Sequence, residues 1–405
     1  MYRNTFIEIN IDNLQNNVKE IIAKYPEYKY YFGVVKGNAY GHSDKIAKYL
    51  VESGINYLAV SSLEEGISIR KDGVTVPILC LEPIELKYIK KCIEYNITIT
   101  LQDTEYFQKL LKEKINGKLK IHIKVDSGLC RLGFTNKNEI KEVVDTLNNN
   151  NNNNNLILEG IYTHFATDGI YDVSWDNQYK NFKDLTSEIN LEKIPIVHLG
   201  RSQTLLNHEK IPFANGIRLG IILYGYNTTP KPLPNDFLNK LRKWKREYYH
   251  KKHNISPTIT DIDINLKTAF SLYSTVIQVK KIKKGSFVGY GRIYEAMEDM
   301  YVAVIPIGYA DGFDRRNTGR QIVINNNRYD LIGEINMGMI IAKVDQSIQT
   351  GDKVTLIGES IPMREVARYM KTSVYEGSCT FNEWIPRVLV KDGNILEIDE
   401  RKEVD

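Results

Sequence analysis

Cysteine is scarce in this chain of 405 residues, and neither sign of charge dominates. The cysteines Cys80, Cys92, Cys130 and Cys379 form no CxxC pair, which argues against a metal site and against a disulfide framework. The net charge of +4 is too small to indicate nucleic acid or an acidic membrane as a partner. No run approaches the roughly 20 apolar residues of a membrane-spanning helix, and the N-terminus lacks a signal peptide. We therefore expect a cytoplasmic protein.

What the first 225 residues do contain is a regular series of short apolar runs. The runs that read as strands are 31–36, 56–60, 77–81, 96–100, 119–125, 158–163, 195–199 and 220–225. Helix-compatible stretches, such as 62–70, 82–95, 104–114 and 137–147, lie between them. Continuous apolar strands that alternate with helices indicate a parallel sheet buried on both faces. The number of strands favours a closed (β/α)₈ barrel over an open, doubly wound sheet.

Composition changes after the barrel. A proline-rich start (TPKPLP) and a basic segment, KLRKWKREYYHKKH, mark residues 229–267 as an inserted linker. The basic segment could contact nucleic acid or lipid headgroups. We interpret it as a solvated excursion, because Trp244 and its two tyrosines make no clear apolar stripe. The asparagine tract 148–155 is interpreted as a surface loop.

Short strands and turns follow the linker. The expected domains are thus a barrel over 1–228 and an all-β domain over 268–405, with the alternating strand 5–10 joining the C-terminal sheet. A final hairpin is expected to turn at Asp392–Gly393, because these residues tolerate positive φ. The predicted fold class is α/β, with a C-terminal β domain after the barrel.

Several polar residues end or follow the expected strands. Lys36, Lys124, Arg131, His164 and Ser202 occupy such positions, and in a barrel they share the face where active sites are built. Lys36 follows the apolar run 32–35 and precedes a Gly-Asn-Ala-Tyr-Gly turn. Partial desolvation there would favour a neutral amine, which attacks an aldehyde. A surface role for an isolated lysine is the competing interpretation.

The segment VVKGNAYGH, which contains Lys36, resembles the pyridoxal-phosphate lysine motif of alanine racemases. Further segments resemble that family in the same order: KVDSGLCRLGF, GIYTHFATD, GIRLGIILYG, AFSLYSTV, VGYGRIY, PIGYADG and the terminal IPR. Because these segments are co-linear over nearly the whole chain, the resemblance is highly specific. It implies a (β/α)₈ barrel followed by a β domain, and a homodimer that shares its sites.

The resemblance also implies roles for individual residues. Lys36 would bind pyridoxal 5'-phosphate and, with Tyr290, would provide the two bases that act on opposite faces of the substrate Cα. The implied cofactor contacts are Lys36, Tyr40, His164, Ser202, Arg218, Gly220 and Ile221, with Arg218 at the pyridine nitrogen. The implied substrate contacts are Arg131, Met337 and Tyr309, and Lys124 matches a lysine that is carbamylated in some members.

Departures from the family pattern keep the substrate side chain open. Asn382 or Glu383 stands where the family usually has a tyrosine beside the substrate pocket, and we take Asn382 as a substrate contact. HLGRSQTLLN and this asparagine are similar to serine racemases of the vancomycin-resistance type. The expected function is an isomerase that converts L-alanine to D-alanine for the cell wall. The alternatives are a serine or broader-specificity racemase and a non-catalytic cofactor-binding regulator.

Overall fold

The computed structural model describes residues 2–149, 155–170, 172–229, 236–253, 258–259 and 262–400. The chain divides into two compact units. The barrel unit comprises residues 15–36 and 47–266, and the β unit comprises 1–14, 37–46 and 267–405. Most of the asparagine tract and the proline-rich start of the expected linker lie outside the described residues.

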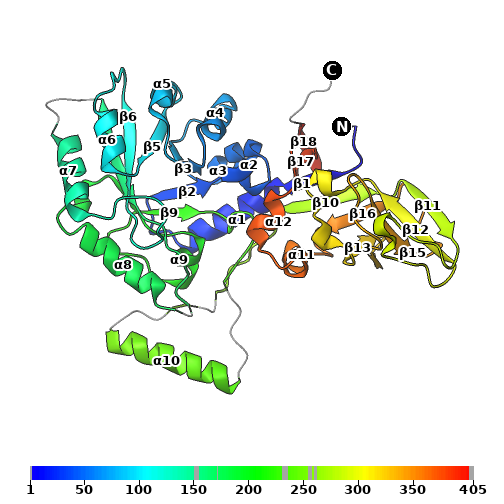
Figure 1. The fold of residues 1–405 in the computed structure, drawn as a ribbon. Coiled ribbons are helices and arrows are strands. Elements are labelled where there is room, and N and C mark those ends of the chain that lie inside the picture. Colours follow the sequence, from blue (N-terminus) through cyan, green and yellow to red (C-terminus); the bar gives the residue numbers. More distant parts are fainter. Residues whose placement is uncertain are drawn as a thin grey trace. The chain divides into compact units, whose positions relative to one another are not determined.

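Eight parallel strands form the sheet of the barrel unit, in the order β8-β7-β6-β5-β4-β3-β2-β9 (Figure 1). They are β2 (Tyr30–Val34), β3 (Tyr57–Val60), β4 (Ile78–Cys80), β5 (Ile97–Leu101), β6 (Leu119–Lys124), β7 (Leu156–Tyr162), β8 (Ile196–His198) and β9 (Gly216–Leu219). The side chains of β3, β4 and β5 are buried throughout, as in parallel sheets covered on both faces. Between β8 and β9, the Arg218 amide donates to the Gly200 carbonyl at 3.2 Å. The barrel is therefore nearly closed, which confirms the predicted fold class.

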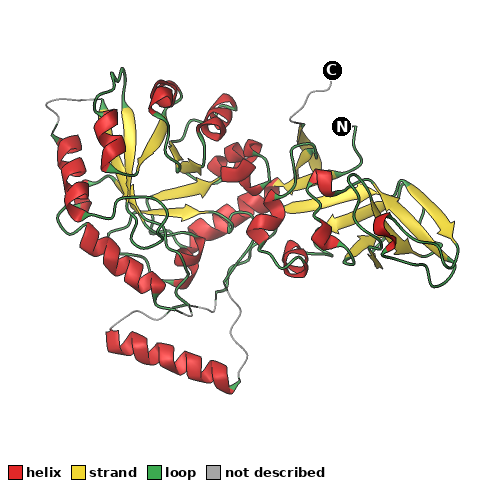
Figure 2. Cartoon of the chain, in the orientation of Figure 1, coloured by secondary structure: helices red, strands yellow, loops and turns green. Residues whose placement is uncertain are grey.

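Helices alternate with these strands and surround them (Figure 2). They are α1 (Ile11–Lys24), α3 (Ala47–Glu52), α4 (Leu63–Lys71), α5 (Ile89–Glu94), α6 (Thr104–Leu110), α7 (Lys137–Asn148), α8 (Ser174–Leu185) and α9 (Ser202–Asn207). A further helix, α10 (Phe237–His253), follows the barrel. Local capping explains several starts: Ser62 and Glu65 form a capping box at α4, and the Asp103 side chain caps α6.

The last barrel strand differs from the sequence prediction. The apolar run 220–225 was predicted as a strand, but the strand is β9, and 220–225 folds into a buried turn. Within that turn, the Leu223 amide donates to Gly220 at 2.9 Å and the Gly225 amide to Ile222 at 3.1 Å. The prediction was wrong for two reasons. The arginine at 218 interrupts the apolar pattern of β9. Residues 220–225 are apolar because the turn they form is buried, and their composition therefore resembles that of a buried strand.

The β unit contains two sheets. The larger has seven strands in the order β14-β13-β16-β10-β1-β17-β18, and the smaller has the order β11-β12-β15. Their bounds are β1 (Phe6–Asn10), β10 (Phe270–Thr275), β11 (Gln278–Ile282), β12 (Met300–Ile305), β13 (Gln321–Ile324), β14 (Asn327–Asp330), β15 (Ile340–Val344), β16 (Lys353–Ile357), β17 (Arg387–Lys391) and β18 (Asn394–Asp399). Strand β1 pairs antiparallel with β10 and parallel with β17. The N-terminal strand thus lies inside the C-terminal sheet.

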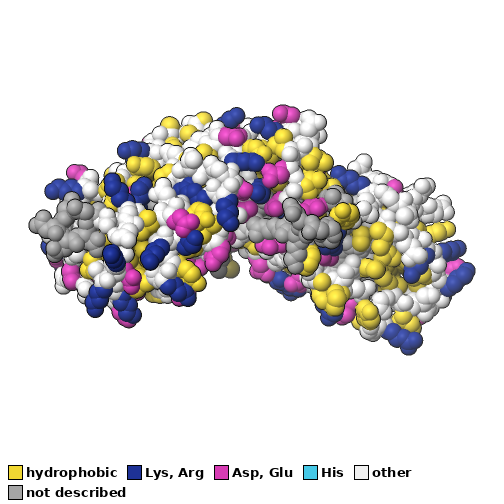
Figure 3. All heavy atoms as spheres, turned by 90° about the horizontal axis from the view of Figure 1, so that it is seen from above, with side chains coloured by type: hydrophobic (Ala, Val, Ile, Leu, Met, Phe, Trp, Pro, Cys, Tyr) yellow, Lys and Arg dark blue, Asp and Glu magenta, His cyan; other side chains and the backbone are white. Residues whose placement is uncertain are grey.

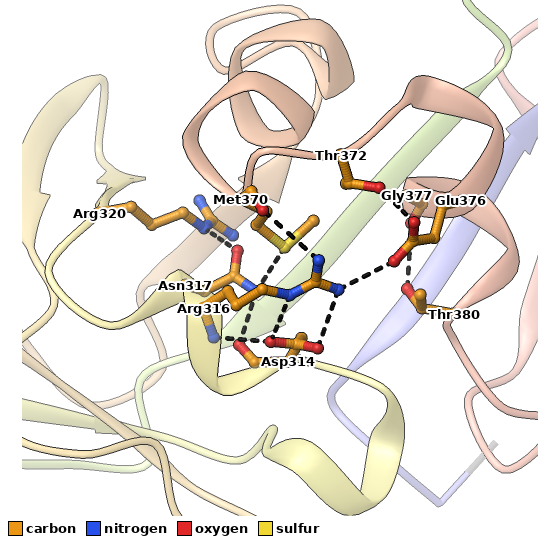
Figure 4. A network of polar contacts seen from close by, with 9 residues as sticks. All are labelled: Asp314, Arg316, Asn317, Arg320, Met370, Thr372, Glu376, Gly377 and Thr380. Atoms are coloured by element: carbon orange, nitrogen blue, oxygen red, sulfur yellow. Dashed lines mark hydrogen bonds and ion pairs between the residues drawn. The ribbon is translucent and has the colours of Figure 1, made fainter.

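Two local features complete the β unit. The β17–β18 hairpin turns at Asp392 and Gly393, whose φ values of 49° and 74° confirm the predicted turn. Two short helices, α11 (Met363–Tyr369) and α12 (Val374–Cys379), were not predicted, so the unit is mostly β rather than all-β. Figure 4 shows the polar network that holds these helices, in which the Arg316 guanidinium contacts Asp314 at 3.0 Å and Glu376 at 2.9 Å.

Candidate active site

Lys36 lies two residues after β2, at the end of the barrel where β2 and β9 finish together. The register pairs Gly33 with Leu219, so the chain after β2 runs beside Gly220 and Ile221, which follow β9. The Val35 amide donates to Ala59 of β3 at 2.9 Å, which fixes the backbone that carries Lys36. The Lys36 side chain is half-buried. This placement puts a lysine amine at the face of the barrel where ligands bind.

The segment after Lys36 is a left-handed turn in the β unit. Residues 37–40 have φ values of 64°, 52°, 51° and 54°. The turn is closed by the Gly41 amide, which donates to the Gly37 carbonyl at 2.9 Å. The Asn38 side chain accepts from the Asp44 amide at 2.9 Å. Left-handed backbone costs about 1–2 kcal/mol for each non-glycine residue. These hydrogen bonds therefore stabilise a strained segment of backbone.

Arg218 is a buried cation near the end of β9. Its guanidinium donates to the carbonyls of Thr163, His198 and Leu199 at 2.6, 2.6 and 2.9 Å, and lies 3.3 Å from Nδ1 of His164. Burial lowers the pKa of Arg218 to about 10, so it stays protonated at neutral pH. Burial and the nearby Arg218 charge hold the pKa of His164 well below its usual value, so this imidazole is neutral. Arg218 is therefore a fixed hydrogen-bond donor beside a neutral ring.

A hydrogen-bond chain runs from Arg218 through the barrel interior to a carboxylate. Nη1 of Arg218 lies 2.7 Å from Nδ1 of His198, and Nε2 of His198 lies 2.9 Å from Nδ1 of His122. Nε2 of His122 then lies 3.2 Å from Glu159. Because arginine only donates, Nδ1 of His198 must accept, and this fixes one tautomer of each neutral imidazole along the chain.

Glu159 is the anionic end of this chain. Burial raises the pKa of Glu159, but its hydrogen bonds to His122, Lys120 and Tyr57 outweigh that effect and lower it to about 2. Burial lowers the pKa of His122 and holds that of His198 well below its usual value, so both rings are neutral. We call Arg218, His198, His122 and Glu159 the barrel relay. The relay connects a buried cation, through two neutral rings, to a half-buried carboxylate that also pairs with Lys120 at 2.7 Å.

Lys124 ends β6 and points into the same barrel end. The side chain is buried, and its Nζ lies 4.9 Å from the centre of the Tyr162 ring. Burial and the charge of Arg218 lower the pKa of Lys124 to about 7. About half of the amine is therefore neutral at pH 7, which is the nucleophilic form.

Three of the four expected phosphate contacts, Ser202, Gly220 and Ile221, come together in the barrel unit, whereas Tyr40 belongs to the β unit. The Ser202 hydroxyl accepts a hydrogen bond from the Gly220 amide at 3.0 Å, and both Ser202 and Ile221 are buried. Arg131 lies on the loop after β6, where its amide donates to Asp126 at 2.7 Å. The barrel unit thus contains an amine at Lys36, a buried cation and a hydroxyl–amide pair. An aldehyde, a pyridine ring and a phosphate are the groups that these would bind, so the residues fit pyridoxal phosphate.

The expected substrate residues of the β unit lie on adjoining loops. The Tyr309 amide donates to the Asn336 carbonyl at 3.0 Å, and the Ala310 amide to the Met337 carbonyl at 2.9 Å. Gly308 permits this approach, because a Cβ atom there would lie 2.3 Å from the Met337 carbonyl oxygen. The Asn382 side chain donates to the Ala310 carbonyl and accepts from the Trp384 amide. Tyr309, Met337 and Asn382 are thus brought together.

Tyr290 occupies a separate loop of the β unit. The loop begins after the Val288 amide, which donates to Tyr294 at 2.9 Å. Gly289 and Gly291, on either side of Tyr290, both have φ of 71°. The Tyr290 side chain is 72% exposed, so the loop presents a phenol to the surroundings.

The fold and the barrel site define a class of protein: a nearly closed parallel barrel with a half-buried lysine at the ligand-binding end and a second, β-rich unit. The family model "Alanine racemase, N-terminal domain" matches residues 9–228, and "Alanine racemase, C-terminal domain" matches 269–389. The chain belongs to the alanine racemase family. It is accordingly an amino-acid racemase, an isomerase that depends on pyridoxal 5'-phosphate.

Individual relatives agree with this assignment over the full length. "Alanine racemase 1" of Bacillus subtilis is 34% identical over 403 residues, which cover 98% of this chain and 96% of that protein. The structure of alanine racemase from Bacillus anthracis with bound L-Ala-P has a TM-score of 0.85 at 31% identity, with 98% of each chain covered. A histidine racemase from Leuconostoc mesenteroides has a TM-score of 0.81 at 25% identity, with 96% of this chain and 98% of that one covered. The same fold therefore occurs with a different named substrate.

Sequence reasoning missed the interior of the relay. His122, His198 and Glu159 lie within strands, where alternating polar residues resemble a half-exposed strand. Gly160, next to Glu159, leaves room for the His122 ring, because a Cβ atom there would lie 2.6 Å from it.

Proposed function

We propose that this protein interconverts L- and D-alanine by a two-base mechanism in which Lys36 and Tyr290 act on opposite faces of the substrate Cα. The observation that carries the proposal is the position of Lys36, half-buried after β2 and beside the Gly220 segment that contacts Ser202. The relatives named as alanine racemases support alanine as the substrate.

Each base has a distinct task. Bound pyridoxal phosphate supplies an electron sink for negative charge that develops at Cα. Lys36 would take or return the Cα proton on one face, and the Tyr290 hydroxyl would do so on the other, so the substrate need not turn over. Arg218 would donate to the pyridine nitrogen and keep its own proton, because its pKa of about 10 lies well above neutral pH.

The substrate contacts favour a small side chain. We propose that Arg131 binds the carboxylate and that Tyr309, Met337 and Asn382 limit the space beside Cα. The Asn382 amide already makes two internal hydrogen bonds, which leave one N–H and one lone pair for a ligand. Tyr40 would contact the phosphate with Ser202, Gly220 and Ile221.

The oligomeric state, the location and the cellular role that we propose rest on the resemblance to the alanine racemase family. We propose a homodimer in the cytoplasm, in which a barrel domain (1–228) is served by the β domain (268–405) of the other copy. D-Alanine made there would supply the cell wall. A bacterial strain that requires D-alanine should grow without it when this protein is expressed, and failure of an active enzyme to support growth would contradict that role.

The two-base assignment is tested by Lys36→Ala and Tyr290→Phe in the purified enzyme. Each substitution should lower kcat for alanine racemisation by at least about 10²-fold, the usual contribution of an acid–base group. The rate at which the substrate Cα hydrogen exchanges in ²H₂O, measured by mass spectrometry, should fall by a similar factor. Lys112→Ala, at an exposed lysine, is the matched control and should retain wild-type activity. Full activity in Lys36→Ala would refute the assignment.

A further inference from the structure

Helix α10 lies between the residues that the two family models match. It spans Phe237–His253 and is drawn as a single straight helix in Figure 1. The two family models match residues 9–228 and 269–389, so α10 falls outside both. The residues of the candidate active site also lie outside it. A role for α10 must therefore be sought in its own surface.

One face of α10 is apolar and exposed. Phe237, Leu241, Trp244 and Tyr248 are spaced by four, three and four residues, which places them on one side of an α-helix. Their side chains are 79%, 40%, 59% and 58% exposed, and the Trp244 and Tyr248 rings stack with centroids 5.9 Å apart. We call these four residues the α10 stripe. The sequence interpretation found no clear apolar stripe because it considered the tryptophan and the tyrosines without Phe237 and Leu241.

Exposed lysines border the stripe on both sides. At 100° per residue, Lys240 and Lys251 lie along one edge, and Lys245 and Lys252 lie along the other. The helix sequence FLNKLRKWKREYYHKKH contains Glu247 as its acidic residue among seven lysines and arginines. On the face in Figure 3, by contrast, acidic and basic side chains are interspersed. The excess of positive charge in α10 is thus a local feature that the net charge of +4 conceals.

One described side chain on the opposite side of α10 is buried. His250 is 8% exposed, and it lies about half a turn away from the stripe. The stripe is therefore on the other side of the helix from His250.

We propose that the α10 stripe is a docking surface for an anionic lipid bilayer, on which the helix lies in the plane of the interface. Phenylalanine, leucine and tryptophan enter the boundary between headgroups and acyl chains, and bordering lysines extend to the lipid phosphates. Such binding is peripheral: among the described residues no helix is long and apolar enough to cross a membrane. A second copy of the helix is the weaker occupant, because face-to-face packing would set the lysine borders of both copies against each other.

Vesicle flotation of the full-length enzyme tests the proposal. Vesicles of phosphatidylcholine with about one third phosphatidylglycerol should bind the enzyme, and vesicles of phosphatidylcholine alone should bind it much more weakly. The double variant Leu241→Ser/Trp244→Ser should lose at least about tenfold in affinity. Lys245→Gln/Lys252→Gln should lose roughly thirtyfold on anionic vesicles, since each lysine near an anionic surface contributes about fivefold.

Matched controls separate docking from general stickiness. Ile395→Ser removes another exposed apolar side chain, and Lys90→Gln/Lys112→Gln removes two exposed lysines elsewhere; both should bind as the wild type does. All α10 variants should racemise alanine at the wild-type rate, which shows that they are folded. Absence of binding to anionic vesicles at low salt would overturn the proposal. So would binding that the α10 variants do not change, or a change confined to the oligomeric state in gel filtration.

Discussion

At the scale of single residues, the chemistry of Lys124 depends on its burial. An amine with a pKa of about 7 is largely neutral at pH 8 and largely protonated at pH 6. The neutral amine attacks carbon dioxide and releases a proton to solvent, and the resulting carbamate would face the positive charges of Arg218 and Arg131, which already act on the pKa of Lys124. We expect Lys124 to be carbamylated.

The test is ¹³C NMR of the enzyme in ¹³C-bicarbonate. A carbamate signal should grow between pH 6 and pH 8 and be absent in Lys124→Arg. A signal of equal size in Lys124→Arg would show that another amine reacts.

The same pKa also affects stability. Because the pKa of Lys124 lies below the ordinary lysine value of 10.5, the unmodified amine lowers the free energy of unfolding most below about pH 7. This penalty decreases as the pH rises toward 10.5.

The barrel relay makes a second prediction at this scale. Glu159→Gln removes the anion that accepts hydrogen bonds from His122 and Tyr57, and it leaves Lys120 without its ion-pair partner at 2.7 Å. The free energy of unfolding should fall by about 2–4 kcal/mol, measured by denaturant unfolding. Glu142→Gln, at an exposed glutamate of α7, is the matched control and should change it by less than about 0.5 kcal/mol.

A readout specific to the relay is ¹⁵N NMR of the histidine rings in the cofactor-free protein. In the wild type, Nδ1 of both His122 and His198 should be unprotonated, because each accepts a hydrogen bond along the chain. Glu159→Gln should change the His122 signals most, since this ring contacts residue 159 directly. Signals of Nδ1-protonated rings in the wild type would contradict the direction assigned to the relay.

At the scale of structural elements, the left-handed turn after Lys36 distinguishes two glycines. Gly37 has φ of 64° and open space where a Cβ would lie, whereas at Gly41 (φ of 81°) a Cβ would lie 2.1 Å from the Ser378 carbonyl oxygen. Gly37→Ala should therefore cost only the left-handed backbone, about 1 kcal/mol. Gly41→Ala adds a clash with main chain and should cost several times more. Thermal unfolding of the two variants measures the difference in stability. Equal losses of stability would show that the backbone near Ser378 moves aside at little cost.

The same scale shows what sequence patterns can and cannot locate. Most barrel strands were predicted within a few residues, because buried parallel strands are continuous apolar runs. The Asp392–Gly393 turn was predicted because its backbone needs residues that accept positive φ. Strand β9 was misplaced because an apolar run indicates that a segment is buried, not that its backbone is extended. The buried turn 220–225 was therefore taken for the strand. Arg218 can be buried in a strand because the carbonyls of Thr163, His198 and Leu199 accept hydrogen bonds from its guanidinium. These three residues are close to Arg218 in space but distant from it in sequence.

At the scale of the whole molecule, the candidate site could be predicted only where a motif marks it. Lys36 and His164 stand in local motifs, so their positions after strands followed from the sequence. The relay could not be predicted, because it depends on strand register, which pairs His122 of β6 with Gly160, next to Glu159, and His198 of β8 with Tyr162. Register is a tertiary property, and no local pattern specifies which interior side chains meet.

The proposed homodimer makes the final prediction at this scale. Tyr290 sits at an exposed loop between two left-handed glycines, a position suited to reaching a second copy. If Lys36 of one copy works with Tyr290 of the other, a dimer of one Lys36→Ala chain and one Tyr290→Phe chain has one site with both defects and one intact site. Random exchange of equal amounts makes about half of the dimers mixed, so activity should recover to about one quarter of the wild type. Two preparations of Lys36→Ala mixed together are the control and should stay inactive. If the mixed sample stays equally inactive while mass spectrometry confirms subunit exchange, the two bases belong to the same chain, because then no combination of subunits rebuilds a site.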